Sequence, residues 1–389
     1  MRAICWNGTN DVRAERVPDP KILRPHDAIV RVTMSSVCGS DLHLLHGLIP
    51  TMKKGDIIGH EFIGEVVEAG PAVKKVQRGE RVVVCSIIGC GACWFCEHEL
   101  YSCCNNTNPS HVVTDTFFGD TTSGIFGYSH AFGGYAGSHA EYVRVPFADV
   151  NAFRVPEGLP DDRYVFASDA LATGYMAADQ AGIQPGDVVA VWGAGGVGQM
   201  AIRSAYLLGA ERVIAIDQLP DRLALARVKG GAEILNFRDV DVLEALRDLT
   251  GGRGPDRCID AVGMEAEEGG LAGLYHHVKQ ALHLEIDRTI VLRQAIMACR
   301  KGGTVSIAGV YAGIRDEIPM GALMNKGLVV RTGQQNGQRY IPKLVELIAR
   351  GDIDPSYLAT HRLPLEEAQR GYEVFSKRQD GCVRVVFTP

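Results

Sequence analysis

The spacing of apolar and polar residues changes near residue 160 and divides the chain into two kinds of sequence. Up to about residue 155, short β-branched runs stand between Gly and Pro turns, a pattern that predicts strands and few helices. The strands predicted in this way lie at residues 28–34, 64–70 and 81–85. The first part of the chain is therefore expected to be rich in β-structure.

Beyond residue 160, short apolar runs alternate with stretches whose apolar residues have helical spacing. The predicted strands lie at residues 187–192, 212–217, 256–262 and 303–309, and the predicted helices at residues 197–208 and 221–228. Strands and helices that alternate in this way are typical of βαβ units. This part is expected to form an α/β domain with a doubly wound parallel sheet.

The pattern changes once more after about residue 325. It predicts helices at residues 341–349 and 365–376 and a final strand at residues 382–387. Because this strand resembles those of the first part, the tail is expected to return to it. The predicted domains are residues 1–160 together with 325–389, and residues 161–324.

Composition excludes several classes of protein. The 389 residues include 40 Lys and Arg and 46 Asp and Glu, and the net charge of -6 argues against a nucleic-acid partner. No apolar run approaches the roughly 18 residues that cross a bilayer. The N-terminus becomes polar too early for a secretory leader. We therefore expect a soluble, cytoplasmic protein that binds neither nucleic acid nor membrane.

The cysteines point to metal chemistry, since eleven cysteines without an export signal argue against a disulfide framework. Five of them fall within fifteen residues, in a predicted lobe at about residues 85–105: Cys90, Cys93, Cys96, Cys103 and Cys104. Four thiolates from one short loop can surround zinc completely, which makes such a site structural. We take Cys104 as the fourth ligand, although spacing alone leaves Cys103 as a competitor. An iron–sulfur cluster would also use four thiolates, but the rest of the sequence favours zinc.

A dinucleotide fingerprint follows the first predicted strand of the α/β part. Gly193, Gly195 and Gly198 form GxGxxG at the start of a predicted helix, where glycines let the backbone meet a pyrophosphate. Asp217 ends the next predicted strand, about 20 residues on, where an acid binds the ribose hydroxyls. Because this carboxylate would repel a 2′-phosphate, NAD is favoured over NADP. Arg222 complicates the choice and is expected to lie along the adenosine.

A second set of possible ligands is dispersed along the chain. Cys38, His60 and Asp169 offer one thiolate, one imidazole and one carboxylate. A catalytic zinc needs three protein ligands and one open position for water or substrate. Read singly, each of these residues is more often a core residue than a ligand, so the set depends on its wider context.

That context resembles a known family. The motif Gly59-His60-Glu61-x2-Gly64-x5-Gly70-x2-Val73 resembles the signature of the zinc alcohol dehydrogenases in the medium-chain dehydrogenase/reductase superfamily. More narrowly, the chain is similar to the glutathione-independent formaldehyde dehydrogenases. That similarity is carried by residues 38–43, 168–175, 299–305 and 360–365 and by the long segment between Gly263 and Gly302. The resemblance runs through almost the whole chain and implies a GroES-like catalytic domain together with a Rossmann domain.

The resemblance also implies roles for particular residues. The implied ligands of a catalytic zinc are Cys38, His60 and Asp169, and Glu61 is the implied carboxylate behind the metal. Ser40 and His43 match a proton relay that passes through a ribose hydroxyl of the cofactor. The implied cofactor contacts are Gly39, Ser40, His43, Gly193, Gly195, Val197, Gly198, Asp217, Arg222 and Val262. With the four-cysteine lobe, this implies two zinc ions per chain, NAD and a homo-oligomer, a tetramer by resemblance.

Two segments bear on the substrate and on cofactor release. Residues 105–132 depart from the branch and carry several aromatic residues, which either pack in the interior or shape a substrate cleft. Residues 264–300 are longer than a βα crossover needs and are expected to form a lid over the adenine end of NAD, with helical patterning from His276 to Ala298. Such a lid would retain NAD(H) during purification.

The sequence thus predicts a zinc-dependent, NAD-linked oxidoreductase for a small alcohol or a hydrated, formaldehyde-like aldehyde. One alternative is a dismutase that oxidises one aldehyde and reduces another on retained NAD(H). A second is a dehydrogenase for a larger secondary alcohol or polyol, with residues 105–132 shaping a wider pocket. A third, outside enzymes, is an NAD-binding structural protein on the same fold.

Overall fold

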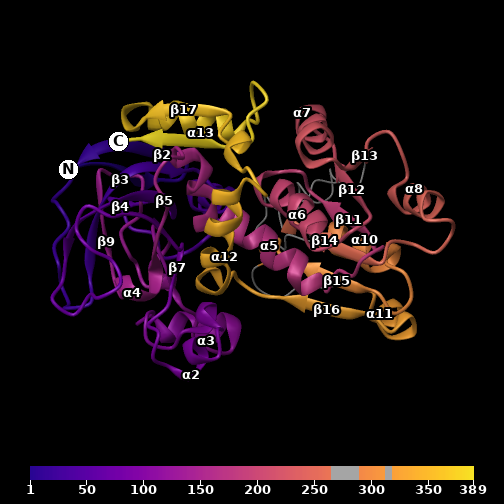
Figure 1. The fold of residues 1–389 in the computed structure, drawn as a ribbon, viewed down its shortest axis with the longest axis horizontal. Helices are drawn as coiled ribbons and strands as arrows, with labels where there is room; N and C mark the ends of the chain where they lie inside the picture. Colours follow the sequence, from indigo (N-terminus) through magenta and orange to yellow (C-terminus); the bar gives the residue numbers. More distant parts are fainter. Residues whose placement is uncertain (264–288, 312–317) are drawn as a thin grey trace. The chain divides into compact units, whose positions relative to one another are not determined.

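The computed structural model describes residues 1–263, 289–311 and 318–389, which divide into two compact units (Figure 1). The first unit comprises Met1–Ala172 and Gln335–Pro389, and the second comprises Thr173–Gln334. The second unit therefore begins at Thr173 rather than at residue 161, and ends at Gln334 rather than at residue 324. The early boundary moves because Ser168 accepts a hydrogen bond from the Ser86 backbone N–H, 3.2 Å away, within the first unit. The late boundary moves because residues 329–332 add a strand to the sheet of the second unit.

Up to residue 155 of the first unit, strand residues outnumber helical residues, as the sequence predicts. Its main sheet has the spatial order β10 (Ala152–Arg154), β6 (Arg81–Val84), β5 (Glu61–Ala69), β3 (Ala28–Ser36), β18 (Val385–Thr388) and β17 (His361–Pro364), with β9 (Tyr142–Val145) also paired to β3. Smaller sheets join β2 (Asp11–Arg16), β1 (Arg2–Gly8) and β4 (Asp56–Ile57), and β7 (Ile87–Ile88) with β8 (Gly124–Ile125). Side chains of the main sheet such as Val30, Phe62 and Val84 are fully buried in its core.

Six α-helices lie in the described part of the first unit. They are α1 (Gly39–Leu45), α2 (Trp94–Glu97), α3 (His111–Phe118), α4 (Ala148–Asn151), α12 (Gly337–Arg350) and α13 (Ala368–Ser376). The C-terminal tail returns to this unit, because Val386 of β18 pairs antiparallel with Ser36 of β3. The final strand begins three residues later than the sequence predicts, at Val385 rather than at residue 382.

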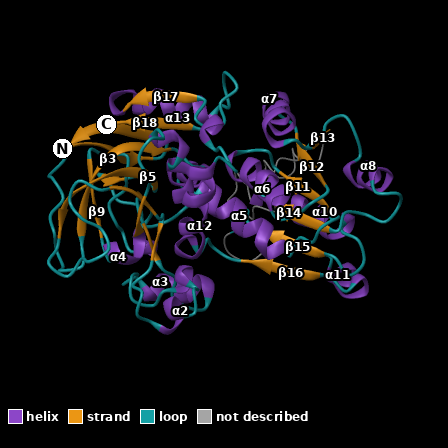
Figure 2. Cartoon of the chain, viewed as in Figure 1, coloured by secondary structure: helices purple, strands orange, loops and turns teal. Residues whose placement is uncertain are grey.

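The described part of the second unit is built around a six-stranded parallel sheet (Figure 2). Its spatial order is β13 (Glu233–Asn236), β12 (Arg212–Asp217), β11 (Val188–Trp192), β14 (Arg257–Asp260), β15 (Thr304–Ile307) and β16 (Val329–Thr332). The helices that accompany it are α5 (Ala170–Ala181, which begins in the first unit), α6 (Gly196–Leu207), α7 (Pro220–Leu225), α8 (Val242–Leu249), α10 (Ile290–Ala298) and α11 (Met320–Lys326). The strands follow the order 3-2-1-4-5-6 of a doubly wound dinucleotide-binding sheet, with the switch point between β11 and β14.

The central strand β11 is buried on both of its faces. Val189 and Val191 of β11 pack in one core, whereas Ala190 and Trp192 pack in the other. A strand covered on both faces has no polar side to display, which explains why its sequence reads as a continuous apolar run rather than as an alternation.

Two sequence predictions for this unit need qualification. The helix predicted at residues 221–228 is α7, after which residues 226–230 continue as a turn of π-helix. The predicted lid spans residues 264–300, of which residues 264–288 lie outside the described residues. Within the remainder, α10 buries Val291, Leu292 and Ile296 in the core against β14, so this part is a covering helix of the sheet.

Candidate functional site

Four side chains of the first unit converge at one end of its main sheet. Ser36 of β3 pairs with Glu61 of β5, so Cys38, two residues after Ser36, and His60, one residue before Glu61, emerge at the same place. Asp169 reaches this place from the turn that precedes α5. One ligand atom from each of Cys38, His60, Glu61 and Asp169 lies within 4.8 Å of all the others.

The geometry of this cluster fits a tetrahedral zinc ion. Asp169 Oδ2 lies 3.2 Å from His60 Nε2 and 3.7 Å from Cys38 Sγ. Zinc–ligand bonds of about 2.0–2.3 Å imply edges of about 3.3–3.7 Å between the ligands of a tetrahedron. Glu61, the fourth member of the cluster, is paired with Arg384. The other three offer one thiolate, one imidazole and one carboxylate, which leaves the fourth position open as a catalytic site requires.

A buried carboxylate that the sequence does not single out holds two of these residues. Asp41 is fully buried; its Oδ1 lies 3.2 Å from His60 Nδ1, and its Oδ2 accepts a hydrogen bond of 2.8 Å from the Cys38 backbone N–H. Burial disfavours the charged form of Asp41, but the nearby His60 outweighs it and holds the pKa of Asp41 below its usual value. Because Nδ1 is engaged by Asp41, Nε2 is the nitrogen that is turned toward a metal. The spacing Cys38-x2-Asp41 at the start of α1 is the one local signal, since the third residue of a helix often reaches back to its cap.

Glu61 is paired with a buried arginine from the other end of the chain. Arg384 Nη2 lies 3.3 Å from Glu61 Oε1, and Arg384 Nη1 donates a hydrogen bond of 2.7 Å to the Val37 carbonyl. Burial lowers the pKa of Arg384, but Glu61 and Cys38 outweigh burial and raise it above its usual value. The arginine also holds the pKa of the Cys38 thiol below its usual value against the effect of burial. Arg384 thus favours the thiolate that metal binding needs.

The residues of the predicted proton relay lie on α1. Ser40 Oγ is 3.2 Å from His60 Nε2, so the hydroxyl stands at the nitrogen that faces the cluster. His43, three residues further, shares that side of the helix and is 4% exposed. Gly39 is the first residue of α1. The structure therefore brings Ser40 to the candidate metal site and places His43 next along the helix.

The four-cysteine cluster lies on a separate loop of the first unit. Sγ atoms of Cys90, Cys93, Cys96 and Cys104 lie within 4.8 Å of one another, and Cys103 is exposed and outside the cluster. The Cys90–Cys96 and Cys93–Cys104 sulfur distances are 4.0 and 3.9 Å. A zinc tetrahedron with bonds of about 2.3 Å has sulfur–sulfur edges of about 3.8 Å. The sulfur positions fit zinc and give Cys104, not Cys103, the fourth corner.

Outer contacts support this second cluster. The Ala92 backbone N–H and Asn106 Nδ2 lie 3.4 and 3.3 Å from Cys90 Sγ as donors. Donors of this kind stabilise negative charge on a ligating sulfur. Since all four donors come from the protein, this cluster has no open position and suits a structural role.

The glycine fingerprint lies in the second unit, between β11 and α6. Gly193 has φ of +87°, a conformation that favours glycine, and Gly195 caps the N-terminus of α6. A Cβ on Gly198 would lie 1.7 Å from the Gly193 carbonyl oxygen, so only glycine allows this approach of helix and strand. Val197 lies in the first turn of α6. Backbone N–H groups at such a helix start can bind a pyrophosphate.

Asp217 lies at the end of β12, as the fingerprint requires, but its carboxylate already has partners. Its Oδ2 accepts a hydrogen bond of 2.7 Å from the Ala194 N–H, and its Oδ1 accepts bonds from Gln218 and Leu219 of 2.7 and 3.0 Å. A carboxylate has about four lone-pair sites, so three bonds leave room for about one ribose hydroxyl. Asp217 therefore positions the glycine loop as well as offering an acceptor.

Two other predicted cofactor residues border the glycine loop. A Cβ on Gly195 would lie 3.4 Å from Arg222 Nη1, which places the guanidinium over the loop. A Cβ on Gly193 would lie 2.6 Å from Val262 Cγ2. Val262 is held there by Asp260, a fully buried residue that the sequence does not single out: its Oδ1 accepts hydrogen bonds of 2.9 and 3.0 Å from the N–H groups of Val262 and Gly263.

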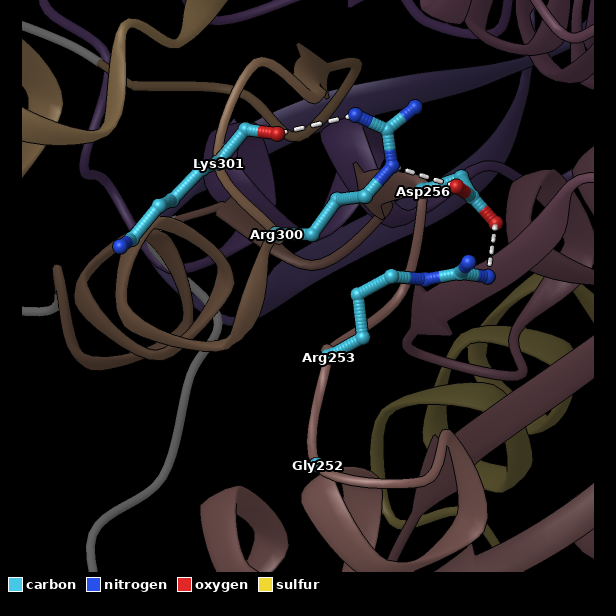
Figure 3. Close-up of a pocket in the computed structure, with 5 residues that line it drawn as sticks. All are labelled: Gly252, Arg253, Asp256, Arg300 and Lys301. Atoms are coloured by element: carbon cyan, nitrogen blue, oxygen red, sulfur yellow. Dashed lines mark hydrogen bonds and ion pairs between the residues drawn. The ribbon is translucent and has the colours of Figure 1, made fainter.

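A cavity of about 590 Å³ in the second unit is a different feature (Figure 3). It is lined by Gly252, Arg253, Asp256, Arg300 and Lys301, which precede the N-terminal ends of β14 and β15. Ligands of doubly wound sheets bind at the carboxyl ends of the strands instead. Both arginines turn toward Asp256, with Arg300 Nε 2.5 Å and Arg253 Nη2 3.8 Å from its carboxylate. Burial disfavours ionisation of Asp256, but a hydrogen bond from the Val188 N–H and the Arg300 guanidinium outweigh it and lower its pKa.

The aromatic residues at 105–132 are divided between core and surface. Tyr128 and Phe132 stack edge-on with centroids 5.3 Å apart in the core of the first unit, and Phe126 packs edge-on against Phe62 at 5.5 Å. Phe118 at the end of α3 is 47% exposed. Packing therefore accounts for Phe126, Tyr128 and Phe132.

Comparisons with known proteins agree with this division into two domains and with zinc binding. Residues 24–157 match the alcohol dehydrogenase GroES-like domain, and residues 196–269 match the zinc-binding dehydrogenase domain. The chain is 41% identical over 392 residues to the zinc-type alcohol dehydrogenase-like protein AdhB of Bacillus subtilis, with 100% of each chain covered. It is 32% identical to a glutathione-independent formaldehyde dehydrogenase of Pseudomonas aeruginosa, with 96% of this chain and 94% of the other covered.

A solved structure is similar over the same length. Alcohol dehydrogenase TADH from Thermus sp. ATN1 superposes with a TM-score of 0.84 at 36% identity and covers 100% of this chain and 99% of its own. Within the described residues, no helix is long and apolar enough to cross a membrane. The chain belongs to the zinc-type alcohol dehydrogenases of the medium-chain dehydrogenase/reductase superfamily, and it is an oxidoreductase with a GroES-like and a Rossmann domain.

Proposed function

We propose that the protein oxidises a small alcohol or a hydrated, formaldehyde-like aldehyde with NAD, using one catalytic and one structural zinc ion per chain. The observation that carries the proposal is the meeting of Cys38, His60 and Asp169, whose three donor atoms are spaced as zinc ligands. Cys90, Cys93, Cys96 and Cys104 would hold the structural ion. A homotetramer, by resemblance, and a cytoplasmic location are part of the same proposal.

Two bound groups supply the chemistry that side chains lack. Zinc is a Lewis acid that lowers the pKa of a coordinating hydroxyl toward neutrality, and NAD accepts a hydride. Cys38, His60 and Asp169 would hold the metal and would leave one position for the substrate oxygen. Asp41 orients His60 through its Nδ1 atom, and the ion pair of Glu61 with Arg384 lies beside the three ligands.

The substrate proton needs an acceptor at the open position. Ser40 Oγ, 3.2 Å from His60 Nε2, stands where it can accept that proton and pass its own onward. His43 on the same helix is the next proton acceptor along this route. His60 and His43 are buried, so the Ser40 hydroxyl and the His43 imidazole are the proposed route for the proton through the protein.

In the second unit, Gly193, Gly195 and Gly198 would hold the pyrophosphate, and Asp217 would accept one ribose hydroxyl. NAD is proposed over NADP because Asp217 is a carboxylate at the end of β12. Arg222 over Gly195 favours a phosphate there, so the cofactor choice is open to a direct test.

Activity across a panel of alcohols and aldehydes, with NAD, with NADP and without added cofactor, tests the proposal. We expect turnover of small alcohols or hydrated aldehydes with added NAD, and two zinc ions per chain by metal analysis. Equimolar acid and alcohol from an aldehyde without added cofactor would identify a dismutase. A preference for large secondary alcohols or polyols would replace the substrate class. If protein that holds both zinc ions turned over none of these substrates, the non-enzyme alternative, an NAD-binding structural protein, would be favoured.

A further inference from the structure

Asp169 differs from the other two candidate ligands because two of its atoms could bind the same metal ion. Its Oδ2 faces His60 Nε2 at 3.2 Å and Cys38 Sγ at 3.7 Å, and is therefore the oxygen turned toward the metal position. A carboxylate can bind a metal through one oxygen or through both. If both oxygens of Asp169 bound, the position that the substrate needs would be filled by protein.

Gln335 covers the second oxygen. Its Nε2 donates a hydrogen bond of 2.7 Å to Asp169 Oδ1, and it also approaches the Ser168 carbonyl at 3.3 Å and the Ser86 hydroxyl. Gln335 is 4% exposed and is the first residue of the segment that returns to the first unit. The amide can take only this orientation, because its oxygen would otherwise face two acceptors, Asp169 Oδ1 and the Ser168 carbonyl.

We propose that Gln335 is a positioning residue that keeps Asp169 bound to the catalytic metal through Oδ2 alone and so preserves the open position for substrate. This inference rests on the zinc site of the proposed function. The amide satisfies Oδ1 with a charge-assisted hydrogen bond, and the oxygen so bound is turned away from the metal. A cysteine at position 169 would offer a single sulfur and would need no such partner.

The test compares Gln335→Met, which keeps the size of the side chain but removes its donor, with Gln338→Met. Gln338 is a matched control: it is 6% exposed, lies three residues further on, and its Nε2 donates to the Ile87 carbonyl and Asn151 Oδ1 at 2.7 and 2.8 Å, with no contact to a candidate ligand. The measurements are the transfer of zinc to a chromophoric chelator and the absorption spectrum after cobalt replaces zinc. The four-cysteine site is the internal reference for Gln335→Met, because Gln335 has no hydrogen bond to that site or to the residues beside it.

We expect Gln335→Met to weaken zinc binding at the catalytic site by about 10- to 100-fold, as loss of a ligand's hydrogen-bond partner does elsewhere. Its cobalt spectrum should weaken toward that of a higher coordination number, whereas Gln338→Met should keep the wild-type spectrum. In an Asp169→Cys background, Gln335→Met should have no further effect on the spectrum or on zinc release.

The opposite results are equally clear. Wild-type zinc release and an unchanged cobalt spectrum in Gln335→Met would overturn the role of Gln335 while leaving two zinc ions and the proposed function intact. Equal effects of Gln335→Met and Gln338→Met would reduce both residues to general packing and overturn it too. A wild-type protein that holds zinc at the four-cysteine site alone would overturn the proposed function together with this inference.

Discussion

Replacing Asp41 by Asn should loosen the catalytic metal without unfolding the protein. Asp41 accepts from the Cys38 backbone N–H through Oδ2, at 2.8 Å, and faces His60 Nδ1 with Oδ1, at 3.2 Å. An asparagine has one oxygen, so its NH2 group must face one of these two donors whichever way it turns. One ligand therefore loses its partner in either orientation.

The magnitude follows from the kind of bond lost. A hydrogen bond to a charged group contributes about 1.5–3 kcal/mol, and about 1.4 kcal/mol is a tenfold change in an equilibrium constant. Zinc affinity at the catalytic site should fall by about 10- to 100-fold in Asp41→Asn, in line with the usual effect of a ligand's outer partner. Chelator competition measures it, with the four-cysteine site as the internal reference.

Asp27→Asn is the matched control. Asp27 is also a buried carboxylate of the first unit, 1% exposed, and it accepts hydrogen bonds of 3.1 and 3.0 Å from the N–H groups of Leu23 and Arg24. Its replacement should lower the free energy of unfolding but leave zinc release unchanged. If Asp41→Asn releases catalytic zinc at the same rate as Asp27→Asn, Asp41 does not orient the metal ligands and the reasoning fails.

Four further outcomes are expected. Cys93→Ala should lose one zinc and fold poorly, because structural metal binding is coupled to folding, whereas His60→Ala should abolish turnover with an unchanged circular dichroism spectrum. One zinc per chain in active wild-type protein would contradict the proposal of two zinc sites. Asp217→Ser should reduce the preference for NAD over NADP in kcat/KM, and equal use of both by the wild type would show that this acid does not select the cofactor. His43→Ala should slow turnover by about 10²–10⁴-fold with partial rescue by a small buffer base, and an unchanged pH profile would remove it from the relay. The pKa of Asp256 lies below its usual value, so the contribution of its carboxylate to the free energy of unfolding is complete at neutral pH and is lost as the pH falls from about 4 through the lowered pKa. In urea at pH 7, Asp256→Asn should therefore be about 1–3 kcal/mol less stable than wild type, and the two proteins should become equally stable in acid. A difference in stability that persists in acid would refute this.

The glycine loop and the four-cysteine lobe could be predicted from the sequence, because each is built from residues close together in the chain. GxGxxG directly after a buried strand predicts a dinucleotide loop, because the strand, turn and helix N-terminus are all local. The four cysteines lie within one short loop, so spacing alone brings their sulfurs together. The choice between Cys103 and Cys104 was open at that level, because neighbouring residues on a short turn point in different directions. The backbone of the turn Tyr101–Cys103 decides it by leaving Cys103 exposed and Cys104 buried.

The catalytic cluster depends on the tertiary structure. Cys38, His60 and Asp169 were assigned by resemblance, because no local rule brings residues so far apart to one point. The register of β3 with β5 brings the first two together, and the turn before α5 adds the third. Asp41, Arg384 and Gln335 carry no sequence signal of comparable strength.

Two of the residues that surround the ligands carry little sequence signal because their partners lie far away in the sequence. Gln335 reaches Asp169 across 166 positions of sequence, and Arg384 reaches Glu61 only because β18 joins the sheet beside β3. Hydrophobic periodicity determines which segments form strands and helices, since it reports which side of each is buried. The pairing of distant strands determines which polar groups share a buried space, where each must find a partner. The sequence by itself therefore determined the fold class, the glycine loop and the four-cysteine lobe, and the tertiary structure decided how the candidate catalytic ligands are held.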